Sequence, residues 1–166
     1  MASEKKYILS KEVAEKKLRR MALEIIENNS GEKQLILAGI RESGTVVAKC
    51  IRTMLAAFSS TKTDLITIKL DKQKPGVVTV SKKMDFNDKV IIVIDDVADS
   101  GRTLLYSLKP FLEFHPKKIQ TLVLVERSHN SFPVRPDYVG LTVSTTLQEH
   151  IFVEVDKEKV LGAYLK

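Results

Sequence analysis

IIVIDDVADSGRT, residues 91–103, holds the strongest structural signal in the chain. Four apolar residues precede two carboxylates, Asp95 and Asp96, which is typical of a strand buried on both faces of a parallel sheet. A small turn containing Gly101 follows and opens a predicted helix over 101–114. A turn at the carboxyl end of a parallel strand directs backbone N–H groups, and the positive end of the next helix, at one spot that suits a phosphate.

The side chains of this stretch complete a predicted site for a sugar phosphate. Ser100 and Thr103 add hydroxyl donors to the turn, and Gly101 lets the backbone approach a ligand closely. Asp95 and Asp96 can accept hydrogen bonds from sugar hydroxyls or approach a metal ion. The order of these groups predicts a phosphate and a ribose bound side by side. An ordinary strand-to-helix turn with an acidic N-cap would account for only one carboxylate and one glycine.

The surrounding elements predict an α/β fold with a mostly parallel central sheet flanked by helices. Apolar positions three and four residues apart predict a helix over 11–28, capped by Ser10, and a second helix through 46–58. VVTV at 77–80 predicts a short hairpin or flap over about 71–88. Continuous apolar runs predict further strands at 34–40, 65–70, 89–95, 119–126 and 150–155.

The composition excludes several classes of protein. With 166 residues, 43% of them hydrophobic, the chain is neither disordered nor fibrous, and its length predicts a single domain over 1–166. Its one cysteine, Cys50, cannot form an internal disulfide, and the first residues lack a secretory signal, so we expect a cytoplasmic protein. No apolar run reaches the roughly 18 residues of a membrane span. The net charge of +6 suits an anionic partner such as a nucleotide, a phosphorylated sugar or RNA.

The stretch 91–103 resembles the phosphoribosyl diphosphate (PRPP) signature of the type I phosphoribosyltransferases. The resemblance implies their fold, and transfer of ribose 5-phosphate from PRPP to a nucleobase with release of pyrophosphate. It implies that Asp95 and Asp96 hold the ribose hydroxyls, and that magnesium is held mainly through PRPP, with no direct protein ligand. The phosphate turn that it implies for the 5'-phosphate consists of Ala98, Asp99, Ser100, Gly101, Arg102 and Thr103. The chain has no GxxxxGK(S/T) string, which argues against a P-loop ATPase.

A second region, LILAGIRESGTVVAK at 35–49, is similar to the first strand, pyrophosphate loop and helix of the same family. In that family the loop grips the leaving diphosphate, and the similarity implies a catalytic role for Arg41. The corresponding loop in this chain consists of Ile40, Arg41, Glu42, Ser43 and Gly44.

A third region, LVLVERSHNSFPVRPDYVGLTVSTT at 122–146, looks like the C-terminal region of the pyrimidine operon attenuator proteins. Those proteins are bifunctional regulators with uracil phosphoribosyltransferase activity. The segment ILSKEVAEKKLRRMALEIIENN at 8–29 matches them too, so the resemblance covers nearly the whole chain. It implies uracil as the base, UMP as the product, a pyrimidine regulatory role and a homo-oligomer, a dimer or higher. The residues expected at the base site are Arg127, Arg135, Asp137, Tyr138 and Val139.

One departure from the attenuator pattern leaves the base open. Asp99 stands where those enzymes have a tyrosine, and purine phosphoribosyltransferases use an aspartate at this position, near the base nitrogen that changes protonation. Asp99 is therefore a candidate catalytic residue that orients or deprotonates the base. The alternative substrate is a purine: hypoxanthine, guanine or xanthine.

Two further departures concern RNA and the flap. Asn130 and Leu141 stand where the regulators have cations that contact RNA. The remaining alternative is a non-catalytic RNA-binding or nucleotide-sensing protein that uses the basic helix face at 16–20. The flap is shorter than in the regulators, which leaves Lys72 and Lys74 as candidates for closing the site.

Overall fold

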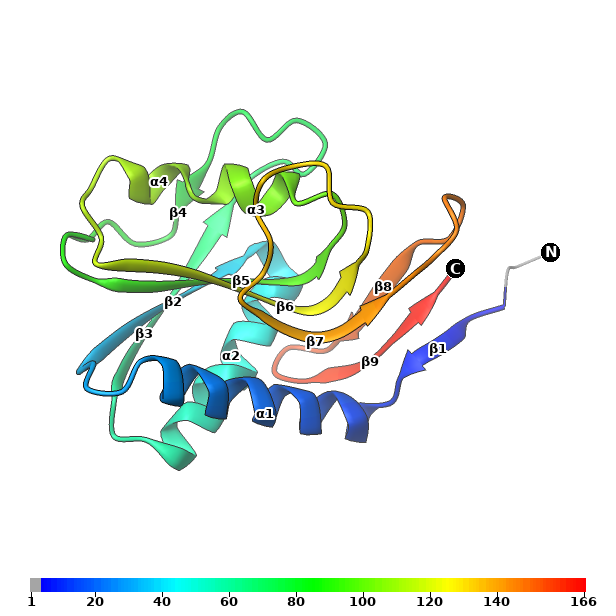
Figure 1. Ribbon diagram of the computed structural model, residues 1–166, viewed down its shortest axis with the longest axis horizontal. Coiled ribbons are helices and arrows are strands. Elements are labelled where there is room, and N and C mark those ends of the chain that lie inside the picture. Colours follow the sequence, from blue (N-terminus) through cyan, green and yellow to red (C-terminus); the bar gives the residue numbers. More distant parts are fainter. Residues whose placement is uncertain (1–3) are drawn as a thin grey trace.

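The computed structural model describes residues 4–166, so residues 1–3 of the predicted domain lie outside the described part of the chain. Two sheets and four helices make up this part (Figure 1). Their order is β1 (Lys6–Leu9), α1 (Lys11–Asn28), β2 (Gln34–Ile40), α2 (Arg41–Phe58), β3 (Lys62–Lys69), β4 (Thr79–Val80), β5 (Val90–Ala98), α3 (Arg102–Ser107), α4 (Lys109–Leu112), β6 (Lys118–Arg127), β7 (Tyr138–Val143), β8 (Ile151–Val155) and β9 (Val160–Leu165).

The larger sheet has the strand order β4-β3-β2-β5-β6-β7. All neighbouring pairs are parallel except the edge pair of β3 and β4, which confirms the predicted, mostly parallel sheet. Strand β5 lies inside the sheet, and its residues Val90–Ile94 are all buried. Since helices cover both faces of the sheet, a strand at this place needs apolar side chains on both faces, which explains the continuous run VIIVI.

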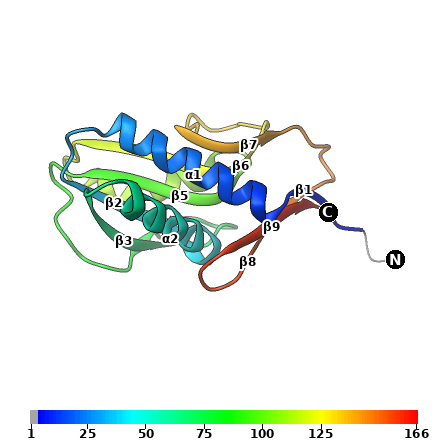
Figure 2. The same cartoon turned by 90° about the horizontal axis from the view of Figure 1, so that it is seen from below.

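Helices cover this sheet in two layers. Figure 1 shows α1 and α2 on one face and α3 and α4 on the other, and Figure 2 shows α1 and α2 side by side. Alternate residues of β5 enter different cores: Ile92 and Ile94 pack in the cluster under α1 and α2, whereas Ile91 and Val93 pack in the opposite cluster. The period of two along a strand therefore assigns each side chain to one layer.

The smaller sheet is antiparallel, with the order β1-β9-β8, and it brings the two ends of the described chain together (Figure 1). Of its strands, only β8 corresponds to a predicted strand. Val160 and Ala163 of β9 lie in the same apolar cluster as α1 and α2, so this sheet packs on the body of the protein. Strand β7 was likewise not among the predicted strands.

The predicted helix over 11–28 is confirmed with its cap, since the Ser10 hydroxyl accepts a hydrogen bond from the backbone N–H of Val13. The predicted helix over 101–114 is instead divided into α3 and α4. Pro110 lies in the first turn of α4. Because proline lacks an N–H and its ring clashes with the preceding turn, one helix cannot continue through this position. No helix within residues 4–166 is long and apolar enough to cross a membrane.

The predicted flap over 71–88 is smaller than expected. Its hairpin has only two paired positions, Ile68 with Val80 and Lys69 with Thr79. Phe86 is 2% exposed and packs edge to face on Phe111 of α4, with ring centroids 4.9 Å apart. The end of the segment therefore belongs to the core, and only its first part can contribute residues to a binding site.

Tyr138, at the start of β7, links this strand to the end of α1 through hydrogen bonds. Its side chain is 1% exposed, and its hydroxyl donates to Gln120 Oε1 at 2.9 Å and accepts from Asn29 Nδ2 at 3.4 Å. Burial raises the pKa of the Tyr138 phenol. The hydroxyl satisfies a partly buried amide, so its removal leaves Gln120 without this partner.

We expect Tyr138→Phe to lower the free energy of unfolding by about 1 kcal/mol, because Gln120 Oε1 loses one of its two donors and keeps the other, Asn29 Nδ2 at 3.0 Å. Urea unfolding followed by circular dichroism measures this change. Tyr106→Phe is the matched control, since the Tyr106 hydroxyl has no hydrogen-bond partner among residues 4–166. Equal midpoints for Tyr138→Phe and the unchanged protein would contradict the structural role.

Candidate active site

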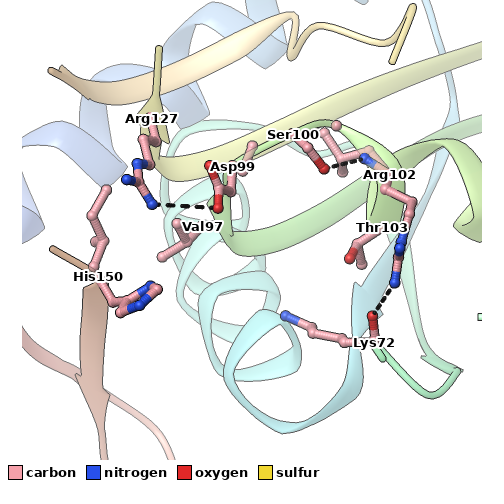
Figure 3. A pocket seen from close by; sticks show the side chains of 12 residues that line it. Lys72, Val97, Asp99, Ser100, Arg102, Thr103, Arg127 and His150 are labelled. Carbon is pink, nitrogen blue, oxygen red and sulfur yellow. Dashed lines mark hydrogen bonds and ion pairs between the residues drawn. The ribbon is translucent and has the colours of Figure 1, made fainter. Parts of the chain in front are cut away.

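The carboxyl ends of β5 and β6 open into a pocket of about 220 Å³ (Figure 3). It brings the phosphate turn, 98–103, together with residues from three distant segments of the chain. Its lining consists of Lys72, Val97, Ala98, Asp99, Ser100, Gly101, Arg102, Thr103, Leu104, Arg127, His150 and Ile151. The predicted turn residues thus all face one hollow.

The phosphate turn depends on Gly101. Its φ of +88° is in the left-handed region, and a Cβ atom there would lie 2.7 Å from Asn130 Oδ1 and 2.9 Å from the carbonyl oxygen of Val134. Both the backbone conformation and the space therefore require glycine. The loop after β6 holds the turn from outside, because the N–H groups of Ser131 and Phe132 donate to the carbonyl oxygen of Ser100.

Asp95 and Asp96 lie near the carboxyl end of β5, and Lys72 contacts both. Lys72 Nζ is 3.3 Å from each Asp95 oxygen and 3.6 Å from Asp96 Oδ1. Burial raises the pKa of Asp95 well above its ordinary value, the charge of Asp96 adds to this, and Lys72 opposes it. Burial lowers the pKa of Lys72, but the charges of Asp95 and Asp96 outweigh it, so this pKa is raised. Protonated Lys72 thus partly balances two adjacent carboxylates.

Arg127, the last residue of β6, forms the inner wall of the pocket opposite Lys72. It is 5% exposed; Nη1 lies 3.5 Å from Asp99 Oδ2, and Nη2 donates to the carbonyl oxygen of Thr146. The buried Nε atom has no hydrogen-bond partner within the described residues. Asp99 is exposed, with its carboxylate beside this guanidinium (Figure 3). The pair therefore offers a hydrogen-bond donor and an acceptor to a ligand.

The predicted pyrophosphate loop is a tight junction instead of a loop. Ile40 ends β2, and Arg41–Gly44 form the first turn of α2. Arg41 has a φ of +51°, so a single residue in the left-handed region turns the chain from strand to helix. A Cβ atom on Gly44 would lie 2.7 Å from the carbonyl oxygen of Ile94, so this turn packs directly on β5 beside Asp95.

Arg41 and Glu42 face a neighbouring hollow that Lys69, Leu70 and Asp71 also line. The start of α2 has no side-chain cap, which leaves its first N–H groups open to an anion. The positive charge of Arg41 also lowers the pKa of Lys72, so the two cations are neighbours. Arg41 in the hollow therefore lies near Lys72 in the pocket.

Of the five residues expected at the base site, only Arg127 lines the pocket. The other four lie before or at the amino end of β7, whereas the pocket lies at the carboxyl ends of the parallel strands. Asp137 accepts from the backbone N–H of Thr121, and the carbonyl oxygen of Val139 accepts from Arg20. The structure thus places Arg135, Asp137, Tyr138 and Val139 away from the pocket, in contacts that hold β7 to its neighbours.

Two pocket residues, His150 and Ile151, lacked a sequence signal for this site. Ile151 is the first residue of β8 and His150 directly precedes it, and the pattern HIFVEV predicts only a strand there. Their place depends on how the smaller sheet packs over the carboxyl end of β5, and local periodicity carries no information on that packing.

The acidic pair beside the pocket, Asp95 and Asp96, suits magnesium only in combination with a ligand. Within residues 4–166, no group of three or more His, Cys, Asp or Glu side chains is placed to hold a metal ion. Asp95 and Asp96 alone provide adjacent carboxylate oxygens there, and magnesium requires six oxygens in octahedral geometry. The donor set therefore fits an ion that brings most of its ligands with it, as phosphate oxygens and water.

The comparisons with known proteins agree with this geometry. A family model for the phosphoribosyl transferase domain matches residues 6–158. The bifunctional protein PyrR of Bacillus pumilus is 34% identical, over 98% of this chain and 99% of its own. The bifunctional protein PyrR of Clostridioides difficile is 36% identical, over 93% and 95%.

Solved structures show the same fold. The crystal structure of the hypoxanthine phosphoribosyltransferase of Trypanosoma cruzi has a TM-score of 0.80 at 13% identity and covers 96% of this chain and 95% of that one. A hypoxanthine-guanine phosphoribosyltransferase of Bacillus anthracis has a TM-score of 0.70 at 22% identity, covering 84% and 85%. The predicted type I phosphoribosyltransferase fold is confirmed. This chain belongs to the phosphoribosyltransferase family, and it is a PRPP-dependent phosphoribosyltransferase.

Proposed function

We propose that the protein transfers ribose 5-phosphate from PRPP to uracil, giving UMP and pyrophosphate. The observation that carries the PRPP half of this proposal is the single hollow formed by the phosphate turn and Lys72, beside the acidic pair of Asp95 and Asp96. The likeness to bifunctional PyrR proteins over nearly the whole chain supports the uracil half.

In the proposed reaction, a ring nitrogen of the base forms a bond to C1 of the ribose, and the diphosphate leaves with the electrons of the broken C1–O bond. The phosphate turn holds the 5'-phosphate through its N–H groups and the Ser100 and Thr103 hydroxyls. Asp95 and Asp96 accept hydrogen bonds from the ribose hydroxyls. Holding both reactants in line supplies a large part of the rate enhancement.

The leaving diphosphate gains negative charge as the C1–O bond breaks. Arg41 and the open N–H groups at the start of α2 stabilise this charge, as the resemblance to the family's pyrophosphate loop implies. Magnesium, held mainly through PRPP, neutralises part of the same charge when it is bound.

The base would lie between Arg127 and the start of β8. Uracil presents carbonyl oxygens that accept hydrogen bonds and N–H groups that donate them. The Arg127 guanidinium lines the pocket and is a donor for a carbonyl oxygen, and the exposed Asp99 carboxylate is an acceptor for an N–H group. Ile151 provides an apolar surface beside them.

The second candidate substrate is a purine, and the position of Asp99 favours it. The Asp99 carboxylate lines the pocket, and purine phosphoribosyltransferases use an aspartate at this position of the phosphate turn. The same carboxylate could receive a proton from a purine nitrogen.

Three further proposals accompany this function. One apolar cluster contains residues of both sheets, which supports a single domain over 1–166. We also propose a cytoplasmic homo-oligomer, from the resemblance to the family.

The basic helix face at 16–20 is partly engaged within the protein. Arg20 pairs with Glu24 and donates to two carbonyl oxygens, and Arg19 lies over the Phe58 ring. We therefore do not extend the proposal to RNA.

Pyrophosphate release with PRPP and magnesium tests the choice of base. We expect release with uracil and background release with hypoxanthine, guanine, xanthine and adenine. Release with a purine alone would overturn the uracil assignment and leave the PRPP-dependent transfer intact.

Asp99→Asn tests the proton transfer. With uracil as substrate we expect turnover to fall by less than tenfold, because Asn keeps a hydrogen-bond acceptor at this position. A purine enzyme that uses Asp99 as a general base would instead lose about 100-fold or more. Steady-state pyrophosphate release measures both cases, with Asp64→Asn as a control remote from the pocket. A loss of 100-fold with uracil would show that Asp99 is the base in this reaction as well.

Asp95→Asn is expected to stabilise the ligand-free protein and to abolish PRPP binding. Below the ordinary pKa of an aspartate, about 4, Asp95 is neutral in both the folded and the unfolded chain. As the pH rises above 4, the unfolded chain ionises first, and the raised pKa of Asp95 costs stability. The free energy of unfolding of the variant should therefore exceed that of the unchanged protein by about 1 kcal/mol at pH 7, which raises its melting temperature. Near pH 3.5 the two melting temperatures should be equal.

Thermal unfolding by calorimetry across this pH range checks the prediction. Asp96→Asn is the matched comparison, since the Asp96 side chain is 15% exposed and that of Asp95 only 1%. A melting temperature for Asp95→Asn below that of the unchanged protein at pH 7 would contradict the expected cost of the buried carboxylate.

A further inference from the structure

Lys72 occupies the sugar half of the proposed site. Its Nζ lies within 3.3 Å of both Asp95 oxygens and 3.6 Å from Asp96 Oδ1. Within the described residues, no other cation forms an ion pair with either carboxylate. Lys72 lines the pocket (Figure 3), and its side chain is 38% exposed, whereas that of Asp95, which its ammonium contacts, is 1% exposed.

The backbone that carries Lys72 is fixed to the helices next to the phosphate turn. Arg102, the first residue of α3, donates through Nη2 to the carbonyl oxygens of Lys72 and Gln73, at 3.1 and 2.8 Å. Lys109 of α4 donates to the carbonyl oxygen of Gly76 at 2.7 Å. The side chain of Lys72 can therefore change its position while its Cα atom stays beside the pocket.

Ribose hydroxyls and the Lys72 ammonium compete for the same carboxylate oxygens. Each is a hydrogen-bond donor, and Asp95 and Asp96 have already used one oxygen each to accept from the backbone N–H groups of Asp96 and Val97. With Lys72 in place the Asp95 side chain is only 1% exposed, so a ribose hydroxyl that reaches this carboxylate takes the place of the ammonium.

We propose that Lys72 is an exchangeable cation of the site, which neutralises the acidic pair in the free protein and moves to the leaving diphosphate when the ribose of PRPP takes its place. This inference rests on the proposed function, because it needs the ribose at Asp95 and Asp96. The direction of the move follows from the charges. Arg41 is near enough to act on Lys72 electrostatically, and the open start of α2 lies on the same side, so an anion there would attract both cations.

The exchange explains how a site with two carboxylates can admit a polyanion. In the free protein, Lys72 reduces the repulsion between the acidic pair and the incoming diphosphate. Once the ribose hydroxyls satisfy the carboxylates, the same charge is available to stabilise the leaving group. Lys72 thus stabilises the leaving diphosphate although it lies outside the predicted pyrophosphate loop, residues 40–44.

Acylation of lysines by an N-hydroxysuccinimide ester, read by peptide mass spectrometry, tests the displacement. Ribose 5-phosphate contains the sugar and the 5'-phosphate without the diphosphate. We expect it to speed acylation of Lys72 by roughly fivefold, the factor that an ion pair of ordinary strength corresponds to. PRPP with magnesium should slow it, because the diphosphate covers the released ammonium. Lys62, exposed at the amino end of β3 and away from the pocket, is the internal control and should not respond.

Calorimetric binding of ribose 5-phosphate and of PRPP distinguishes failure of the Lys72 exchange from failure of the proposed function. If ribose 5-phosphate binds and Lys72 acylation stays unchanged or slows, the exchange is wrong and the proposed function stands. If neither ribose 5-phosphate nor PRPP binds, the proposed function fails, and the exchange fails with it.

Lys72→Met tests the second half of the proposal, with Lys62→Met, at the exposed amino end of β3, as the matched control. We expect kcat to fall by about 100-fold, the order found when one charge-stabilising donor is removed, while KM for PRPP changes little. Lys72→Arg keeps the charge and should recover most of kcat, which a purely structural role would not require. Equal kcat for Lys72→Met and Lys62→Met would overturn the role at the diphosphate.

Discussion

The burial of Asp95 on β5, next to a second carboxylate, is the constraint on which the site depends. Its side chain is 1% exposed, and its pKa is raised because burial and the charge of Asp96 both oppose ionisation. A carboxylate at this depth costs stability unless a cation or a ligand compensates for it. Lys72 is that cation in the free protein, and the fully apolar run Val90–Ile94 supplies the packing that offsets the cost.

The parallel sheet brings the remaining groups to this carboxylate. Parallel strands end at the same edge, so the turn after β5, Arg127 at the end of β6 and the start of α2 after β2 converge without long connections. The smaller sheet then adds the start of β8 from the other side. Hydrogen bonds link these segments: the loop after β6 donates to Ser100, and Arg102 holds the backbone of Lys72. A ligand phosphate in the turn therefore contacts the same framework that positions the cation.

The base half of the site combines features of two kinds of relative. Sequence identity over nearly the full length joins the chain to bifunctional PyrR proteins, whereas Asp99 is the residue type that purine enzymes have in the phosphate turn. Because Asp99 is paired with Arg127, an aspartate at this position is compatible with a pyrimidine as well as a purine substrate. A carboxylate beside a buried guanidinium can orient an N–H group of either kind of base.

The amino-acid sequence by itself determined the parallel sheet, the capped helix α1 and the phosphate turn, because periodicity, capping and the need for glycine at position 101 act over a few neighbouring residues. Only the tertiary structure decided that Arg135–Val139 lie away from the pocket, that the pyrophosphate segment is a helix start, and that Lys72 and His150 face the pocket. These outcomes depend on strand direction, sheet packing and side-chain reach between residues far apart in the chain. Local patterns specify elements, and only packing specifies which of their side chains meet.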